Sequence, residues 1–193
     1  MNSSRGNRLL RAASLVLTAA YPLAVYFLLD RGDVRLAGLV VLLVLALRFL
    51  APGATRLQVA VGLAAGALFA AAIALTNSET LARLYPVAVN SALLLAFGVT
   101  LKKPPCMIER IARATGVVLD EAGVRYTRAV TVVWCAFFVV NGGIALVTAL
   151  VTSRETWALY NGLLSYVMAG ALLLGERVVR PVFQRRFAES ATR

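Results

Sequence analysis

A few polar side chains lie inside long apolar runs of this chain, and their types could bind or transform a ligand. They are Asn90, Ser91, Asn141, Asn161, Ser165 and Tyr166. An amide or hydroxyl group in hydrocarbon needs a hydrogen-bond partner, usually on a neighbouring helix. Two interpretations follow. These residues hold helices together, or they form an intramembrane polar pocket for a lipid or a small substrate.

Residues that commonly carry catalysis are scarce. The chain has no histidine, which removes the commonest metal ligand and the commonest general base. Its two cysteines, Cys106 and Cys135, are predicted to lie apart, so we expect no disulfide. Glu109 and the Asp120-Glu121 pair are expected to face solvent. Because the sequence contains no catalytic triad, phosphate-binding loop or Cys/His cluster, we expect no catalytic site, cofactor or metal.

Six long apolar stretches must position these side chains. They cover residues 12–29, 36–50, 57–75, 84–101, 129–151 and 157–175. A lone segment in a bilayer satisfies its backbone polar groups only as a helix, and about twenty residues suffice to cross. The chain is 60% hydrophobic and 15% charged, so we predict one all-α polytopic membrane domain over residues 1–193. Whether the short second stretch crosses the bilayer is left open.

The first apolar stretch follows a basic segment that contains Arg5, Arg8 and Arg11, an arrangement also found in secretion signals. The stretch is longer than the apolar part of a usual signal, and no clear cleavage site follows it. We therefore expect an uncleaved first span. Aromatic residues near predicted span ends are expected to anchor at the membrane surface, namely Tyr85, Trp134, Trp157 and Tyr160.

Basic residues are divided unevenly between the connections. With six spans and the amino terminus inside, the cytoplasmic segments carry 16 of the 20 Lys and Arg residues, and the external segments carry four. Such an excess marks the cytoplasmic side. We therefore predict an even number of spans with both termini in the cytoplasm. The net charge of +11 then reflects orientation and contact with anionic lipid headgroups, not nucleic acid.

The connection at residues 102–128 is the polar stretch with room for structure. Around Met107 to Arg113 apolar and charged residues alternate, with Glu109 and Arg113 at helical spacing. This pattern predicts a short amphipathic helix on the inner leaflet; the alternative is a solvated loop with one helical turn. With the basic tail at 176–193, this connection supplies the candidate anionic-lipid contacts: Lys102, Lys103, Arg110, Arg113, Arg180, Arg185 and Arg186.

Several short motifs lie in the second half of the chain. They are Leu84-Tyr-Pro-Val-Ala-Val-Asn90, Ile108-Glu109-Arg110-Ile-Ala-Arg113, Val133-Trp134-Cys135 and Trp157-Ala-Leu-Tyr-Asn-Gly162. Over roughly residues 80–187 the chain resembles a family of small bacterial inner-membrane proteins encoded among the fatty-acid-like enzymes that make aryl-polyene pigments. More distantly, its layout resembles the intracellular septation protein A family, which is linked to cell elongation, division and envelope integrity. Neither resemblance implies a catalytic residue.

These observations favour a non-enzymatic scaffold or lipid-associated helper in envelope lipid or pigment biosynthesis, or in envelope maintenance. Its expected partners are membrane lipids and envelope-biosynthesis or division proteins; its oligomeric state is left open. The alternative is a small transporter or flippase for a lipid-linked product, suggested by the polar residues and by the echo of Tyr21-Pro22 in Tyr85-Pro86. A membrane-embedded lipid-synthesis enzyme is a third hypothesis that no residue set supports.

Overall fold

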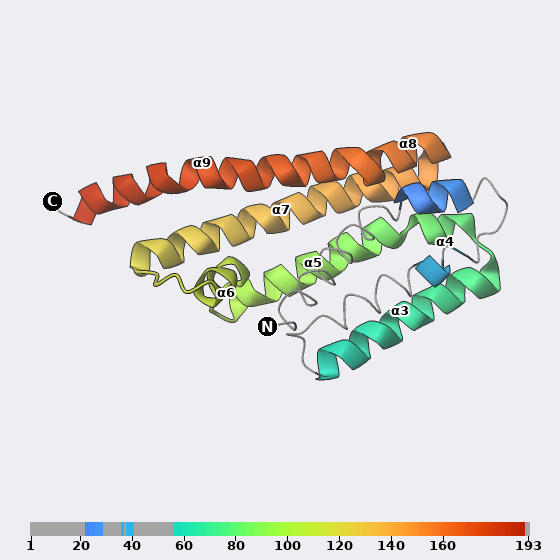
Figure 1. Cartoon of the computed structure of the whole chain (residues 1–193), viewed down its shortest axis with the longest axis horizontal. Helices are drawn as coiled ribbons and strands as arrows, with labels where there is room; N and C mark the ends of the chain where they lie inside the picture. The colour runs from blue at the N-terminus through green and yellow to red at the C-terminus, as the bar shows by residue number, and fades with distance from the viewer. Residues whose placement is uncertain (1–21, 29–35, 37, 41–55, 192–193) are drawn as a thin grey trace, which may run out of the picture. The chain divides into compact units, whose positions relative to one another are not determined.

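The computed structural model describes residues 22–28, 36, 38–40 and 56–191, with side chains described only from residue 63 to residue 181 in the last range. Most of the predicted spans 12–29 and 36–50, and with them the expected uncleaved first span, lie outside these residues. Within the described ranges every regular element is a helix (Figure 1). The predicted all-α class is confirmed for this part of the chain.

Seven α-helices and one π-helical turn are described in full. They are α3 (Arg56–Thr76), α4 (Glu79–Arg83), α5 (Tyr85–Lys102), α6 (Met107–Ala114), α7 (Glu121–Val151), α8 (Arg154–Leu159), η1 (Tyr160–Leu164) and α9 (Ser165–Ala191). Among the described residues, three stretches are long and apolar enough to cross a membrane: Glu79–Lys102, Glu121–Val151 and Arg154–Pro181. They contain the predicted spans 84–101, 129–151 and 157–175. The total of six spans and the side of the termini stay predictions.

Helices α7 and α9 extend beyond the predicted spans. Helix α7 begins at Glu121, eight residues before the predicted start at 129, and the Asp120 Oδ1 atom accepts a hydrogen bond from the Gly123 N–H group at 2.7 Å. Such an N-cap stabilises a helix start without any apolar residue. Helix α9 continues to Ala191, through most of the predicted tail. The predicted loop 102–128 and tail 176–193 are therefore partly helical, because hydropathy detects only the apolar part of a helix.

The chain divides into two compact units. The first comprises Met1–Tyr85 and Val147–Leu164, and the second comprises Pro86–Leu146 and Ser165–Arg193. In the first unit, the side chains of Val25, Ile73 and Trp157 are fully buried. A Cβ atom at Gly38 would lie 3.0 Å from the Ala70 carbonyl oxygen on α3. A glycine therefore permits this close backbone approach.

In the second unit, α5 and α7 run antiparallel. Asn90 near the start of α5 bonds to Asn141 late in α7, and Leu101 at the end of α5 bonds to Arg128 early in α7. Helix α9 returns beside α7 (Figure 1), where the Tyr126 hydroxyl donates to the Glu176 carboxylate at 3.2 Å. Helix α6 joins the end of α5 to the start of α7.

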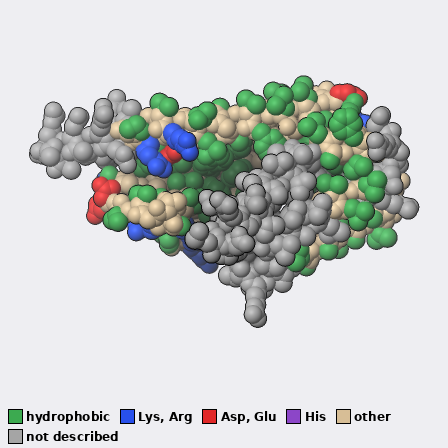
Figure 2. Space-filling model, in the orientation of Figure 1, with side chains coloured by type: hydrophobic (Ala, Val, Ile, Leu, Met, Phe, Trp, Pro, Cys, Tyr) green, Lys and Arg blue, Asp and Glu red, His purple; other side chains and the backbone are tan. Residues whose placement is uncertain are grey.

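Large aliphatic side chains are exposed along these helices, and Figure 2 shows hydrophobic groups over much of the visible described surface. Leu75 on α3 is 87% exposed, Leu95 on α5 is 67% exposed and Val178 on α9 is 70% exposed. Water-soluble monomers seldom expose so much contiguous apolar surface. Exposed aliphatic side chains agree with the length and apolar composition of the helices that could cross a membrane.

Candidate functional site

Two of the predicted pocket residues meet in the second unit. The Asn141 Nδ2 atom donates a hydrogen bond to the Asn90 Oδ1 atom at 3.0 Å, and the Asn90 Nδ2 atom donates to the Pro86 carbonyl at 2.8 Å. Both asparagine side chains are buried. Beside them, a Cβ atom at Gly142 would lie 3.1 Å from the Asn90 Cβ atom. The pair therefore joins α5 to α7 at a close helix crossing.

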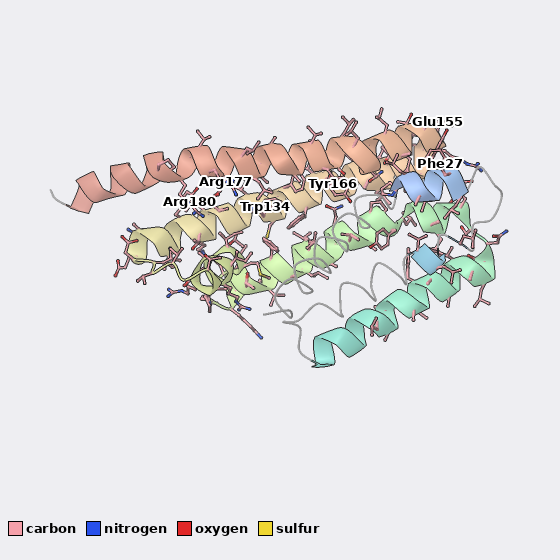
Figure 3. The ribbon with its side chains drawn as sticks, viewed as in Figure 1. Phe27, Trp134, Glu155, Tyr166, Arg177 and Arg180 are labelled. Carbon is pink, nitrogen blue, oxygen red and sulfur yellow. The ribbon has the colours of Figure 1, made fainter. Side chains whose placement is uncertain are left out.

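The other four predicted pocket residues lie elsewhere. Ser91 on α5 is exposed, and on α9 Ser165 is buried whereas Tyr166 is 41% exposed (Figure 3). Asn161 belongs to the first unit, in the π-helical turn η1. Its Nδ2 atom donates to the Thr148 Oγ1 atom at 3.2 Å and to the Trp157 carbonyl at 2.9 Å. Asn90 and Asn141, from α5 and α7, are thus brought together by a hydrogen bond between their side chains.

A cluster around Arg83 in the first unit was not predicted. One guanidinium nitrogen of Arg83 donates to the carbonyls of Thr148, Thr152 and Ser153 at 2.8, 2.7 and 3.3 Å. These carbonyls lie at and just beyond the end of α7, where a helix has no internal partners for its last C=O groups. Arg83 on α4 therefore caps α7 from outside that helix. In the sequence Arg83 stood out only as the single basic residue of its connection.

Glu79 and Trp157 complete this cluster. The Arg154 guanidinium binds both carboxylate oxygens of Glu79, at 2.7 and 2.6 Å, in the bidentate geometry that arginine favours. The Trp157 Nε1–H group donates to the Arg83 carbonyl at 3.0 Å, and the Arg83 guanidinium lies 5.8 Å from the indole centroid. The expected anchoring of Trp157 at the membrane surface is wrong, because its side chain is fully buried.

The prediction of anchoring at the membrane surface is also wrong for Tyr85 and Tyr160. Tyr85 and Tyr160 are buried in the first unit, with 7% and 9% of their surface exposed. Trp134 on α7, labelled in Figure 3, packs against Phe97 and Phe138 with centroid separations of 6.4 and 5.6 Å. Burial of Tyr85 and Tyr160 contradicts their anchoring in headgroups, whereas Trp134 is partly exposed and its anchoring stays a prediction.

Helix α6 is fixed across α5 and α7 by hydroxyl groups. The Met107 N–H donates to the Thr100 Oγ1 atom of α5 at 2.9 Å, and the Ile108 N–H donates to the Thr131 Oγ1 atom of α7 at 3.4 Å. The Cys106 thiol contacts the Thr127 hydroxyl at 3.7 Å. The two hydrogen bonds from Met107 and Ile108 satisfy amides that a helix start leaves free. The predicted short helix is confirmed, and the solvated-loop alternative is wrong.

Glu109 on α6 is the clearest correction at residue level. Its side chain was expected to face solvent, yet Glu109 is 6% exposed. Arg113 neutralises it through a hydrogen bond from Nε at 2.9 Å and an ion pair from Nη2 at 2.8 Å, both to the Oε1 atom of Glu109. The docking of α6 turns this position inward, and it leaves Arg110 and Ile111 exposed on the outer face.

The candidate lipid contacts divide into paired and unpaired cations. Arg113 pairs with Glu109, and Arg180 pairs with Glu176 at 3.0 Å on α9 beside the start of α7 (Figure 3). Lys102 and Lys103 are exposed, and Arg110 is exposed with two guanidinium nitrogens on backbone carbonyls. The side chains of Arg185 and Arg186 lie outside those that the structure describes.

Within the described part of the chain, no group of three or more His, Cys, Asp or Glu side chains could hold a metal ion. No family model, curated protein or solved structure matches this chain. The resemblance to the aryl-polyene-associated and septation protein families therefore stays a prediction. What the described residues define is a helical protein with three helices of membrane-crossing length.

Proposed function

We propose that this protein is a non-enzymatic, multi-span protein of the bacterial inner membrane. It acts as a scaffold or lipid-associated helper in envelope lipid or pigment biosynthesis, or in envelope maintenance. Its partners are membrane lipids and the proteins of those processes.

The hydrogen bond between Asn141 and Asn90 carries this proposal. These two side chains were the best candidates for a ligand site within the membrane-length helices, and each is buried with its polar group on a partner. A polar pair of this kind holds helices together. The described geometry thus favours helix packing over a polar path for a transported substrate.

A paired substitution separates packing from transport. Asn141→Leu alone should destabilise the protein by about 0.6 kcal/mol, and by no more than roughly 1.7 kcal/mol, because it leaves the Asn90 Oδ1 atom without its donor. Asn90→Leu with Asn141→Leu should recover most of that loss, since removing both partners of a hydrogen bond is close to neutral. Thermal unfolding in detergent micelles measures both values.

The functional test measures envelope composition in a strain that lacks the protein. Its envelope lipid or pigment composition should change, and both the unaltered chain and the double-leucine variant should restore it. The tagged chain in mild detergent should also recover envelope-biosynthesis or division proteins. Purified protein in liposomes should not move a labelled lipid between leaflets. A folded double variant that fails to restore the envelope would favour the transporter, and unchanged lipids with no recovered partner would refute the scaffold.

A further inference from the structure

We infer that the carboxyl-terminal end of α5 is a binding site for the phosphate headgroup of an anionic phospholipid. This inference rests on the proposed lipid-associated function and names its ligand. Four cations form the site: Lys102, Lys103, Arg110 and Arg128. We call this set the α5 cation cluster.

Backbone carbonyls hold the two arginines of the cluster in place. The Arg128 guanidinium donates to the Leu101 carbonyl at 2.9 Å, and Arg110 donates to the carbonyls of Pro105 and Lys103 at 2.7 and 3.3 Å. Leu101 and Lys103 are two residues apart, so their Cα atoms lie within about 7 Å of each other. The two guanidinium groups are thereby held at one helix end, and Leu101 and Lys103, which accept from them, are the sequence neighbours of Lys102.

Each arginine keeps donors for a ligand. A guanidinium carries five N–H donors, and Arg128 uses one nitrogen whereas Arg110 uses two. Both side chains are exposed. A guanidinium fixed in this way loses little freedom when it binds the oxygens of a phosphate, which its planar fork matches.

The cluster carries uncompensated positive charge. The nearby carboxylates within the described residues are otherwise engaged: Glu109 with Arg113, Glu121 with Arg125, and Asp120 with the Gly123 amide. No ion pair joins any of the four cluster residues to a described carboxylate. An anion from outside the chain is therefore the complementary partner.

The position of the cluster identifies the anion as a lipid headgroup. It lies at the end of Glu79–Lys102, a stretch that is long and apolar enough to cross a membrane. The connection that follows exposes Ile111, Val117 and Val118, and Val118 is 94% exposed. Aliphatic side chains beside cations are typical of surfaces that enter the headgroup region. A soluble phosphate compound would use the cations but not the aliphatic groups.

Two neighbouring arginines of α7 provide a matched test. Arg128→Gln and Arg125→Gln each remove one charge within a single helical turn, but Arg125 is paired with Glu121 and is not part of the cluster. The probe is phosphatidylglycerol, titrated into the full chain in phosphatidylcholine-containing micelles and counted by native mass spectrometry. Arg128→Gln should weaken binding by about fivefold. Arg125→Gln should weaken it by less than about twofold, since Glu121 already offsets that charge.

Lys102→Gln with Lys103→Gln is a second variant that breaks no described hydrogen bond. It should weaken phosphatidylglycerol binding by roughly 25-fold. Equal losses of phosphatidylglycerol binding in Arg128→Gln and Arg125→Gln, or undiminished binding by the double-lysine variant, would refute the site. Neither result would refute the proposed scaffold. If the unaltered protein does not prefer phosphatidylglycerol to phosphatidylcholine, the lipid-associated part of the proposed function fails as well. Displacement of the lipid by an equal concentration of inorganic phosphate would show a free-phosphate site and overturn the lipid assignment.

Discussion

At the scale of single residues, Arg83 joins several parts of the first unit. It caps the end of α7, lies against the Trp157 ring and is 3.8 Å from the Glu79 carboxylate. Its side chain is only 11% exposed. A cation at a helix carboxyl terminus interacts favourably with the helix dipole. We therefore expect Arg83 to stabilise the corner formed by α4, the end of α7 and α8.

Arg83→Ala should lower the free energy of unfolding by about 2–3 kcal/mol, because hydrogen bonds from a charged donor are lost and part-buried carbonyls lose their partner. Arg83→Lys should recover only part of this, since an ammonium group lacks the planar fork. Arg125→Ala is the control, and loss of its exposed pair with Glu121 should cost under about 1 kcal/mol. Chemical unfolding in micelles compares the three, and equal losses for Arg83→Ala and Arg125→Ala would contradict the capping role.

Residue types alone predict some of the side-chain partners but not all of them. Asparagine in an apolar run predicts a hydrogen-bond partner, and Asn90 and Asn141 have one. Which partner it is could not be predicted, because the two residues are 51 positions apart and only helix packing brings them together. The burial of Glu109 was missed for a related reason. It depends on the docking of α6 through Thr100 and Thr131, and no local pattern reports those contacts.

At the scale of elements, the α5–α7 crossing depends on a small residue. Gly142→Ala should destabilise the protein by about 1–3 kcal/mol, because the new methyl group would lie 3.1 Å from the Asn90 Cβ atom and would push the helices apart. Gly143→Ala is the matched control. Nothing lies within 4 Å of a Cβ atom there, so the better helix propensity of alanine should leave stability unchanged or raised by up to about 1 kcal/mol. Thermal unfolding distinguishes them, and similar effects at both glycines would contradict the close crossing.

The existence of helices was easier to predict than their ends. The apolar stretch 84–101 coincides with almost all of α5, and the stretch 129–151 coincides with α7 from residue 129 to its end, since a bilayer selects for length and hydropathy. The first turns of α7 are polar, with Glu121 and Arg125 at i,i+4 spacing. Their helicity rests on capping by Asp120 and on packing of Tyr126 against α9. Hydropathy contains no information on the cap or on the contact with α9.

At the scale of the whole molecule, apolar length predicted more than the polar residues did. The membrane-crossing lengths of Glu79–Lys102, Glu121–Val151 and Arg154–Pro181 agree with three of the six predicted spans. The division into two units, with Asn161 in one and Asn90 in the other, had no signal in the sequence. Composition reports the solvent that a chain needs, whereas the partners of individual side chains depend on tertiary packing.

The central claim is a multi-span protein whose basic connection at 102–128 faces the cytoplasm. Helix α7 has 31 residues and is about 46 Å long, enough to cross a hydrocarbon core of about 30 Å. Its two ends then lie on opposite sides of the membrane. Cys106 is a poor probe of this, because its thiol is buried. Val118 before α7 is exposed. Glu155 after α7 is exposed as well, and Figure 3 labels it.

The most direct test is labelling with a membrane-impermeant thiol reagent in a chain that carries Cys106→Ser and Cys135→Ala. In intact spheroplasts, Glu155→Cys should be labelled and Val118→Cys should not. In inverted membrane vesicles the two results should be reversed. Labelling of Val118→Cys in intact spheroplasts, or labelling of both positions from the same side, would contradict the account.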